Sequence, residues 1–378
     1  MRPTLPNRLV NQGFSIIEIM VGLAIGLISM LIVMQVFATF EGQKRTTTSG
    51  ANAQTSGGLG LYTMERDIRM AGYGFSASVG CTLQTAQAMP APFSDALLKA
   101  VRIDAGVGSL PDTLTLFTSD KSSWSVPIGY LPIPPAAPPI FAPGVSLGLV
   151  SPAGVAAGDM MIAYQGSTCT LFQVDSVDTT DPLNPFLNHS AGSWNGAIAG
   201  APTYTSQAQL MDLGNFVGHS YALDVTGNLV ATGYCATNAN SYSACPATVN
   251  SASSQILASD IVNMKAQYGF DTNPDPRTTV NVNNWSSAMI DADGSGTAGD
   301  IGDIRRIYAV RLAIVARSGL KEKPQSDGTC NTTTVGTMAW AGGTLDITIN
   351  PDGSANPDWQ CYRYKTFETV IPLRNLIW

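Results

Sequence analysis

The longest apolar run of the chain lies near its amino terminus. Between Ile19 and Phe40, 22 consecutive residues carry no formal charge. As an α-helix such a run is about 33 Å long, close to the thickness of a bilayer core. The run is apolar on all sides, which favours a membrane span over about residues 16–40 rather than a buried helix of a soluble protein. Arg2 and Arg8 precede it, so the amino end is expected to stay cytoplasmic while the rest of the chain crosses.

A weaker helical pattern follows the span. Residues 41–60 are rich in Thr and Gly, which lower helix propensity, so the helix is expected to stretch or break there. It is expected to resume over residues 61–71. Four apolar residues then share one face at helical spacing, and this face is predicted to be core: Leu61, Met64, Ile68 and Ala71.

The rest of the chain reads as short strands. Runs of β-branched and aromatic residues bounded by turn residues begin at Asp112, Asp159 and Cys169. Two longer runs, residues 261–270 and 307–318, are predicted to be neighbours in an antiparallel sheet. In the first, one face is expected to hold Val262, Met264, Ala266, Tyr268 and Phe270. In the second, Tyr308, Val310, Leu312 and Ile314 are opposed to Arg311 and Arg317. The proline-rich residues 130–144 cannot be central sheet.

Composition narrows the class of protein. Only 12% of the residues are charged, the net charge is −7, and there are 37 Gly and 23 Pro. This profile favours a loop-rich, β-rich exported domain over a helical cytosolic enzyme. The acidic balance argues against general binding of nucleic acid, whose phosphates attract basic surfaces.

Cysteine placement indicates an oxidising compartment. All six cysteines follow the apolar run, and they show neither CxxC spacing nor zinc-type spacing with histidine: Cys81, Cys169, Cys235, Cys245, Cys330 and Cys361. An even number on one side of a span predicts disulfides. Cys235 and Cys245 are close enough in sequence to close a short loop and are the first expected pair. Six buried free thiols are the alternative.

The expected processing point lies before the apolar run. A secretory signal peptide would be cut after its apolar region. Here Gly13, which has no side chain to obstruct a protease, precedes Phe14, and the carboxylate of Glu18 follows at the start of the run. This arrangement resembles the class III signal, or prepilin-type amino-terminal methylation motif, of type IV pilins. The resemblance implies that a prepilin peptidase removes residues 1–13 and methylates the new terminal Phe14.

Three further segments resemble one branch of that family. Residues 64–75 ("MERDIRMAGYGF"), 306–318 and 369–378 are similar to the corresponding parts of PilW-type minor pilins. The resemblance implies an α+β, type IV pilin-like fold. Its long amino-terminal hydrophobic helix (residues 14–75) would pack on an exported antiparallel β-sheet domain (76–378) with large loop insertions. Residues 76–254 carry no recognised pattern.

The resemblance also implies a function and a set of partners. A PilW-type minor pilin is a structural subunit that primes type IV pilus (fimbrium) assembly at or near the tip, and it contributes to twitching motility and cell adhesion. The implied partners are other minor and major pilins, the prepilin peptidase, the inner-membrane assembly platform and a large tip adhesin. The chain would be a single-pass bacterial inner-membrane protein before assembly and reach the pilus tip at the cell surface afterwards. A pseudopilin of a type II secretion tip complex is the alternative.

Glu18 is costly in hydrocarbon unless it has a partner. The pilin resemblance implies that it pairs with the terminal ammonium of Phe14 in a neighbouring subunit. The alternative is that Glu18 reaches the cytoplasmic interface from its place near the helix start. Gly22 and Gly26 form a GxxxG pattern that suits close helix packing.

An Asp/Gly-rich loop at residues 291–303 is the candidate metal site. Asp291, Asp293 and Ser295 stand at the first three ligand offsets of a calcium loop, and Thr297 could offer its carbonyl. The twelfth position is Gly302 rather than Glu, so Asp300 or Asp303 would have to compensate. Such loops are also common without metal. No other cofactor is expected.

A hydrolase is the most distant alternative. Gly144 to Gly148 fits GxSxG around Ser146, but a nucleophile elbow needs a strand before it and a helix after it. A proline-rich stretch precedes Ser146. The two histidines, His189 and His219, stand in no motif. The chain is therefore expected not to be an enzyme, with a membrane-anchored periplasmic hydrolase as the remaining possibility.

Overall fold

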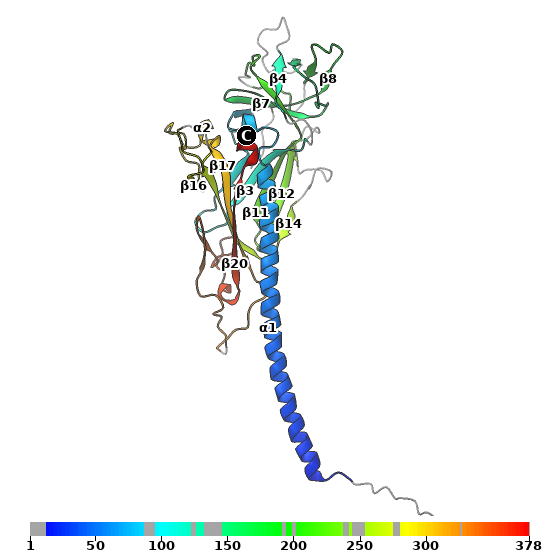
Figure 1. The fold of residues 1–378 in the computed structure, drawn as a ribbon, viewed down its shortest axis with the longest axis vertical. Coiled ribbons are helices and arrows are strands. Elements are labelled where there is room, and N and C mark those ends of the chain that lie inside the picture. The colour runs from blue at the N-terminus through cyan, green and yellow to red at the C-terminus, as the bar shows by residue number, and fades with distance from the viewer. Residues whose placement is uncertain are drawn as a thin grey trace, which may run out of the picture. The chain divides into compact units, whose positions relative to one another are not determined.

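The computed structural model describes residues 13–86, 95–121, 126–131, 146–190, 194–198, 202–236, 242–243, 254–274, 280–325 and 327–377. The chain divides into two compact units, Met1–Ala51 and Asn52–Trp378. The boundary falls within helix α1 (Ile16–Met70), drawn in blue in Figure 1.

Helix α1 is continuous through residues 41–60, so the expected break is wrong. In the second unit Gly57 and Gly60 lie where α1 packs closely against strands, whereas Gly58 has open space where a β-carbon would lie. A β-carbon at Gly57 would lie 2.2 Å from the ring of Phe367, and one at Gly60 would lie 3.0 Å from Leu229. Close packing on this face stabilises a helix that propensity alone would weaken.

The buried stripe of α1 recurs at helical spacing. Ala53, Met64, Ile68 and the following Ala71 are buried. This confirms three of the four predicted core positions, while Leu61 is only partly buried against the same core. The helix ends at Met70, and Gly72 adopts a left-handed conformation with φ of 77°. Glycine reaches this region without a β-carbon penalty, which suits a helix end.

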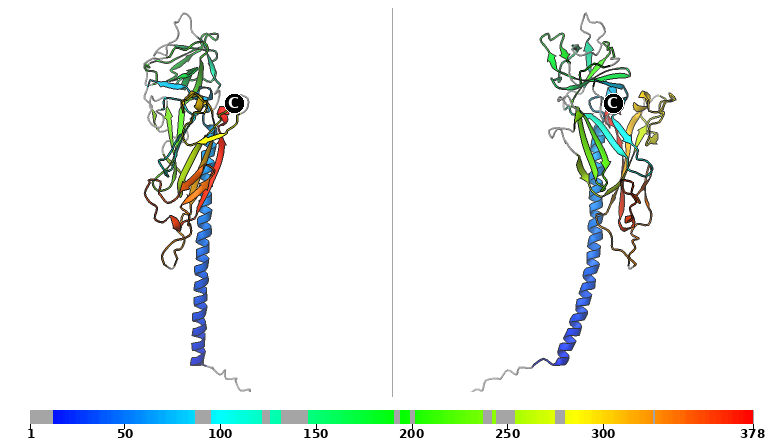
Figure 2. Two further views of the ribbon diagram at one scale, coloured as in Figure 1. Left: turned by 90° about the vertical axis from the view of Figure 1, so that its left-hand side faces the viewer. Right: turned by 180° about the vertical axis from the view of Figure 1, so that it is seen from behind.

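The described strands form three larger sheets and one hairpin. The four-stranded sheet has the order β16 (Asn284–Ser286), β15 (Ile261–Phe270), β17 (Ile307–Arg317), β20 (Tyr364–Pro372). The six-stranded sheet contains β13 (Tyr242–Ser243), β12 (Leu229–Ala236), β11 (Phe216–Leu223), β3 (Thr113–Ser119) and β2 (Val101–Asp104), with β14 (Gln255–Ala258) beside β12. The hairpin is β18 (Thr337–Trp340) and β19 (Gly343–Asp346). Figure 2 shows β17 and β20 side by side in orange and red.

The eight-stranded sheet is built mostly from residues between β3 and β11. Its order is β1 (Thr82–Thr85), β7 (Thr168–Gln173), β6 (Met160–Gln165), β10 (Gln209–Gly214), β4 (Ile128–Leu131), β5 (Leu147–Leu149), β9 (Phe186–Asn188), β8 (Ser176–Asp178). β1 and β7 run parallel, and the other pairs in this sheet are antiparallel. One face has a core of its own around Leu149, Phe172 and Leu187. This sheet lies in the part of the chain, residues 76–254, that carried no recognised pattern, and it contains the strands predicted from Asp159 and Cys169.

Four short helical segments complete the described fold. They are η1 (Ser76–Ser78), α2 (Ile301–Ile304), η2 (Trp359–Cys361) and α3 (Arg374–Ile377). The α+β architecture, with a long amino-terminal helix and antiparallel sheets, is confirmed.

The predicted pairing of residues 261–270 with 307–318 is confirmed as β15 against β17. Val262 is the exception to the predicted alternation. A register shift between Ile261 and Asn263 places Val262 in a small core with Val315 and Leu345, on the side covered by the β18–β19 hairpin. The strand predicted from Cys169 is divided into β7 and β8. Tyr130 and Leu131 end strand β4, and the rest of the proline-rich stretch lies outside the described residues.

Candidate functional site

The predicted cleavage point lies just before α1. Gly13 and Phe14 precede the helix, which begins at Ile16. A β-carbon at Gly13 would meet nothing within 4 Å, and the Phe14 side chain is 81% exposed. Within the described residues, no packing obstructs the Gly13–Phe14 peptide bond, which is compatible with cleavage there.

Glu18 and Ser15 together cap the first turn of α1. The Ser15 hydroxyl accepts a hydrogen bond from the Ile17 N–H at 3.3 Å, and the Glu18 carboxylate accepts one from the Ser15 N–H at 3.4 Å. Both donors belong to the otherwise unsatisfied first turn. This role of Glu18 was not predicted, although the S-x-x-E sequence at residues 15–18 is typical of a helix start. The carboxylate thus reaches the N–H of the residue next to Phe14.

The first half of α1 is apolar and unburied. Among the described residues, α1 is the one helix long and apolar enough to cross a membrane. Its most apolar 18 residues have a mean hydropathy of 2.6, and none of this segment is buried. Gly22 and Gly26 have open space where a β-carbon would lie. A surface of this kind requires lipid or neighbouring helices around it.

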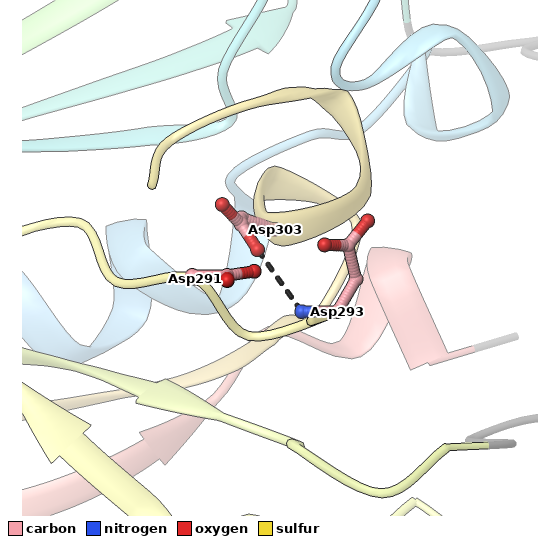
Figure 3. Close-up of side chains that lie close together, drawn as sticks. All are labelled: Asp291, Asp293 and Asp303. Atoms are coloured by element: carbon pink, nitrogen blue, oxygen red, sulfur yellow. Dashed lines mark hydrogen bonds between the residues drawn. The ribbon is translucent and has the colours of Figure 1, made fainter. Parts of the chain in front are cut away.

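The Asp/Gly-rich loop brings three of its predicted ligands together. Carboxylate oxygens of Asp291, Asp293 and Asp303 all lie within 4.8 Å of one another (Figure 3). Asp291 and Asp293 are exposed, whereas Asp303 is fully buried. Three clustered carboxylates are an oxygen ligand set of the kind that calcium prefers.

Asp303 is also the structural centre of this loop. One of its oxygens accepts the N–H groups of Ala292 and Asp293, at 2.5 and 3.1 Å. The other accepts those of Gly299 and Asp300, at 2.7 and 3.2 Å. Its carboxylate would therefore hold the loop in shape with or without a cation.

The other predicted ligands bond within the loop. The Ser295 hydroxyl donates to Asp300 at 2.8 Å, and Asp300 caps helix α2 by accepting the Asp303 N–H. The Thr297 carbonyl lies 3.5 Å from the Ser295 hydroxyl. The N–H of Ser295 donates to Asp293 and lowers the pKa of that carboxyl, which favours its charged form.

Gly302 stands where a calcium loop usually has glutamate, and a side chain there would have to displace the Asp293 carboxylate. A β-carbon at Gly302 would lie 1.8 Å from a carboxylate oxygen of Asp293. The next carboxylate along the chain, Asp303, occupies the cluster instead.

Two of the predicted disulfides lie in the described residues, and neither was the first expected pair. Cys81 is bonded to Cys169, and Cys330 to Cys361. The first joins the segment after α1 to β7, with a Cα–Cα distance of 5.7 Å. Cys235 is also disulfide-bonded, but the expected partner Cys245 lies outside the described residues. The alternative of six free thiols is wrong, since none of the described cysteines is free.

Ser146 lacks the context of a nucleophile elbow. It is followed by strand β5 rather than a helix, and its hydroxyl donates to Asn188 at 2.6 Å. Gly144 lies outside the described residues. His189 is buried against Phe172, and burial lowers its pKa to about 4. Burial also lowers the pKa of His219 in β11.

Comparison with known proteins bears on the carboxyl-terminal part of the chain. Residues 220–375 match the family model of Type IV pilus-assembly protein W (PilW), which confirms the PilW resemblance there. A comparison with curated protein sequences finds no match. Among solved structures, the chain is similar to a type IV-like pilin from Thermus thermophilus at 10% identity and a TM-score of 0.33. That alignment covers 84% of this chain and 94% of the other.

Proposed function

We propose that this chain is a minor pilin, a structural subunit that primes assembly of a type IV pilus at or near its tip and thereby serves twitching motility and adhesion. The observation that carries the proposal is the match of residues 220–375 to a pilus-assembly family. These residues include the ladder of β15, β17 and β20. The membrane-length apolar half of α1 supports it.

The amino-terminal segment anchors the chain in the membrane and then packs into the filament. In the proposed pathway, prepilin peptidase removes residues 1–13 and methylates Phe14, and the chain waits in the inner membrane with its amino end cytoplasmic. The apolar side chains of α1 then exchange lipid for the helices of other minor and major pilins. Because lipid tails are as apolar as those helices, close packing and polar pairing must favour the exchange.

Glu18 is the polar group available for that pairing. In the membrane it caps its own helix near the interface. In the filament, we propose, it pairs with the terminal ammonium of Phe14 on a neighbouring subunit. Pairing offsets the cost of placing both charges in hydrocarbon.

The test is complementation of a deletion strain of the source bacterium. The wild-type chain is expected to restore twitching. It is also expected to appear at low abundance in sheared pili, together with the other minor and major pilins. Gly13→Arg, which places a large cation at the cleavage point, is expected to leave uncut precursor in the membrane and to restore nothing. Gly42→Arg, at an open position beyond the predicted span, is the matched control.

Two results would contradict the proposal. Normal piliation and twitching in the deletion strain would show that the chain does not prime pili. Loss of protein secretion with normal pili would identify it instead as a type II secretion pseudopilin.

A further inference from the structure

Strand β20 forms an unusually long edge. It pairs with β17 over nine positions without a register shift, and within the described residues it has no partner on its other side. The other edge strands of the three larger sheets have two to four residues each: β16, β2, β13, β14, β1 and β8. Soluble proteins commonly keep exposed edges short, because unpaired backbone groups invite other strands.

The ladder shows which backbone groups of β20 point outward. The Ser318 N–H donates to the Arg363 carbonyl, and the Leu373 N–H donates to the Tyr308 carbonyl, both at 2.8 Å. Inward-bonding residues alternate in an antiparallel ladder, so the odd-numbered residues of β20 bond to β17. The outward groups therefore belong to Tyr364, Thr366, Glu368 and Val370, and to Pro372, which has no N–H.

Both faces of β20 are partly packed. On one face, Phe367 contacts α1 at Gly57. On the other, the carboxylate of Glu368 accepts the Ala341 N–H at 2.8 Å, and Tyr364 packs against the small core beneath the β18–β19 hairpin. The strand is thus held in place, and the Val370 side chain near its end is 52% exposed. An incoming partner can reach the outward backbone groups of β20 along its edge, beside the exposed side chains of Glu368 and Val370.

We propose that the outer edge of β20 pairs with an extended strand of a neighbouring pilus subunit, which continues the four-stranded sheet by one strand. The inference rests on the proposed function. A row of alternating N–H and C=O groups selects extended main chain. Thr366 and Val370, both uncharged and β-branched, suit a strand opposite them, and the exposed carboxylate of Glu368 between them favours a polar or basic residue at that position.

The size of the edge argues for a partner that is already close by. A strand of nine residues spans about 30 Å. Pairing along one such edge falls short of the roughly 1,200–2,000 Å² buried in stable interfaces between free proteins. A neighbouring subunit held beside β20 by helix packing supplies the high effective concentration that such a contact needs. A second copy of this chain that approaches β20 from solution has no such high effective concentration.

The experiment is photo-crosslinking of the full-length chain in the complemented deletion strain. A benzoylphenylalanine placed at position 370 is expected to form an adduct with another pilus subunit, and mass spectrometry is expected to locate it in a strand segment of that subunit. The same probe at Val225, which is 70% exposed and lies on a turn beyond β11, is the positional control and is expected to form no such adduct.

A second variant tests the backbone pairing itself. Thr366→Pro removes one outward N–H and no hydrogen bond to β17. It is expected to reduce the adduct about fivefold, as the loss of one hydrogen bond worth about 1 kcal/mol would. Thr366→Val, which keeps the N–H, is the matched control. Both variants are first checked for wild-type thermal unfolding in detergent. If Thr366→Pro fails that check, Thr366→Lys places a charge on the edge instead.

The outcomes separate this inference from the proposed function. If the chain is found in sheared pili but yields no subunit adduct from position 370, the edge pairing is wrong and the pilin role stands. An adduct with a second copy of this chain, or one that the edge variant leaves unchanged, also overturns the pairing. Absence of the chain from pili overturns both.

Discussion

A β-carbon on Gly57 of α1 would lie 2.2 Å from a ring carbon of Phe367 in β20. Residues more than three hundred positions apart are thus in close contact, and the contact requires glycine. The neighbouring Gly58 has open space at the same point. Two adjacent glycines of one helix therefore have opposite tolerances for a side chain.

We expect Gly57→Ala to destabilise the second unit by about 1–2 kcal/mol, because crowding of Phe367 outweighs the gain in helix propensity. Gly58→Ala, the matched control, is expected to stabilise it by about 0.5–1 kcal/mol. Urea unfolding of the full chain in detergent measures both. Equal effects of the two substitutions would show that the Phe367 contact is not tight.

Glu18→Ala is expected to leave insertion and cleavage normal while depleting the chain from sheared pili. Insertion depends on the apolar run and the positive leader, which the substitution keeps. Assembly would leave the ammonium of Phe14 unpaired in hydrocarbon, at a cost of roughly 2.5–3.5 kcal/mol or more. Comparison of membrane and pilus fractions by immunoblot measures the effect.

Glu18→Gln separates capping from charge pairing. Glutamine can accept the Ser15 N–H as glutamate does, but it carries no charge. If pairing is the function of Glu18, this variant is depleted from pili as Glu18→Ala is. Normal incorporation of Glu18→Gln would mean that helix capping alone accounts for the residue.

Calcium is expected to raise the melting temperature of the chain through Asp291, Asp293 and Asp303. A ligand at a hundredfold excess over its dissociation constant stabilises the folded state by about 2.7 kcal/mol. Differential scanning calorimetry in calcium and in chelator is the measurement. The double variant Asp291→Asn, Asp293→Asn should lose the shift. Asp352→Asn, in an exposed turn between β19 and η2, should keep it. The same melting temperature in calcium and chelator would leave Asp303 as a purely structural residue.

Buried His189 predicts a loss of stability in mild acid. Its pKa falls from 6.5 to about 4 because burial disfavours the charged ring. Below pH 6.5 the unfolded chain binds a proton that the folded chain does not, so stability is lost as the pH falls toward 4. From pH 7 to pH 5 the loss is about 2 kcal/mol. His189→Gln should remove that part of the pH dependence in urea titrations. If His189→Gln leaves the pH dependence of stability unchanged, other titratable groups cause the loss in acid.

The sequence by itself determined the membrane-length helix, the isolated carboxylate at its start and the pairing of the β15 and β17 segments. Each is a local pattern: a charge-free run, a fixed offset or a two-residue alternation. Tertiary structure decided what depends on distant partners. Long-range packing made glycine suitable within α1, and a register shift moved Val262 to the opposite face. The disulfide partners of Cys81 and Cys330 and the open edge of β20 also follow from how strands far apart in sequence meet. Periodicity reveals which face a strand buries, whereas its neighbours depend on contacts that no short stretch of sequence contains.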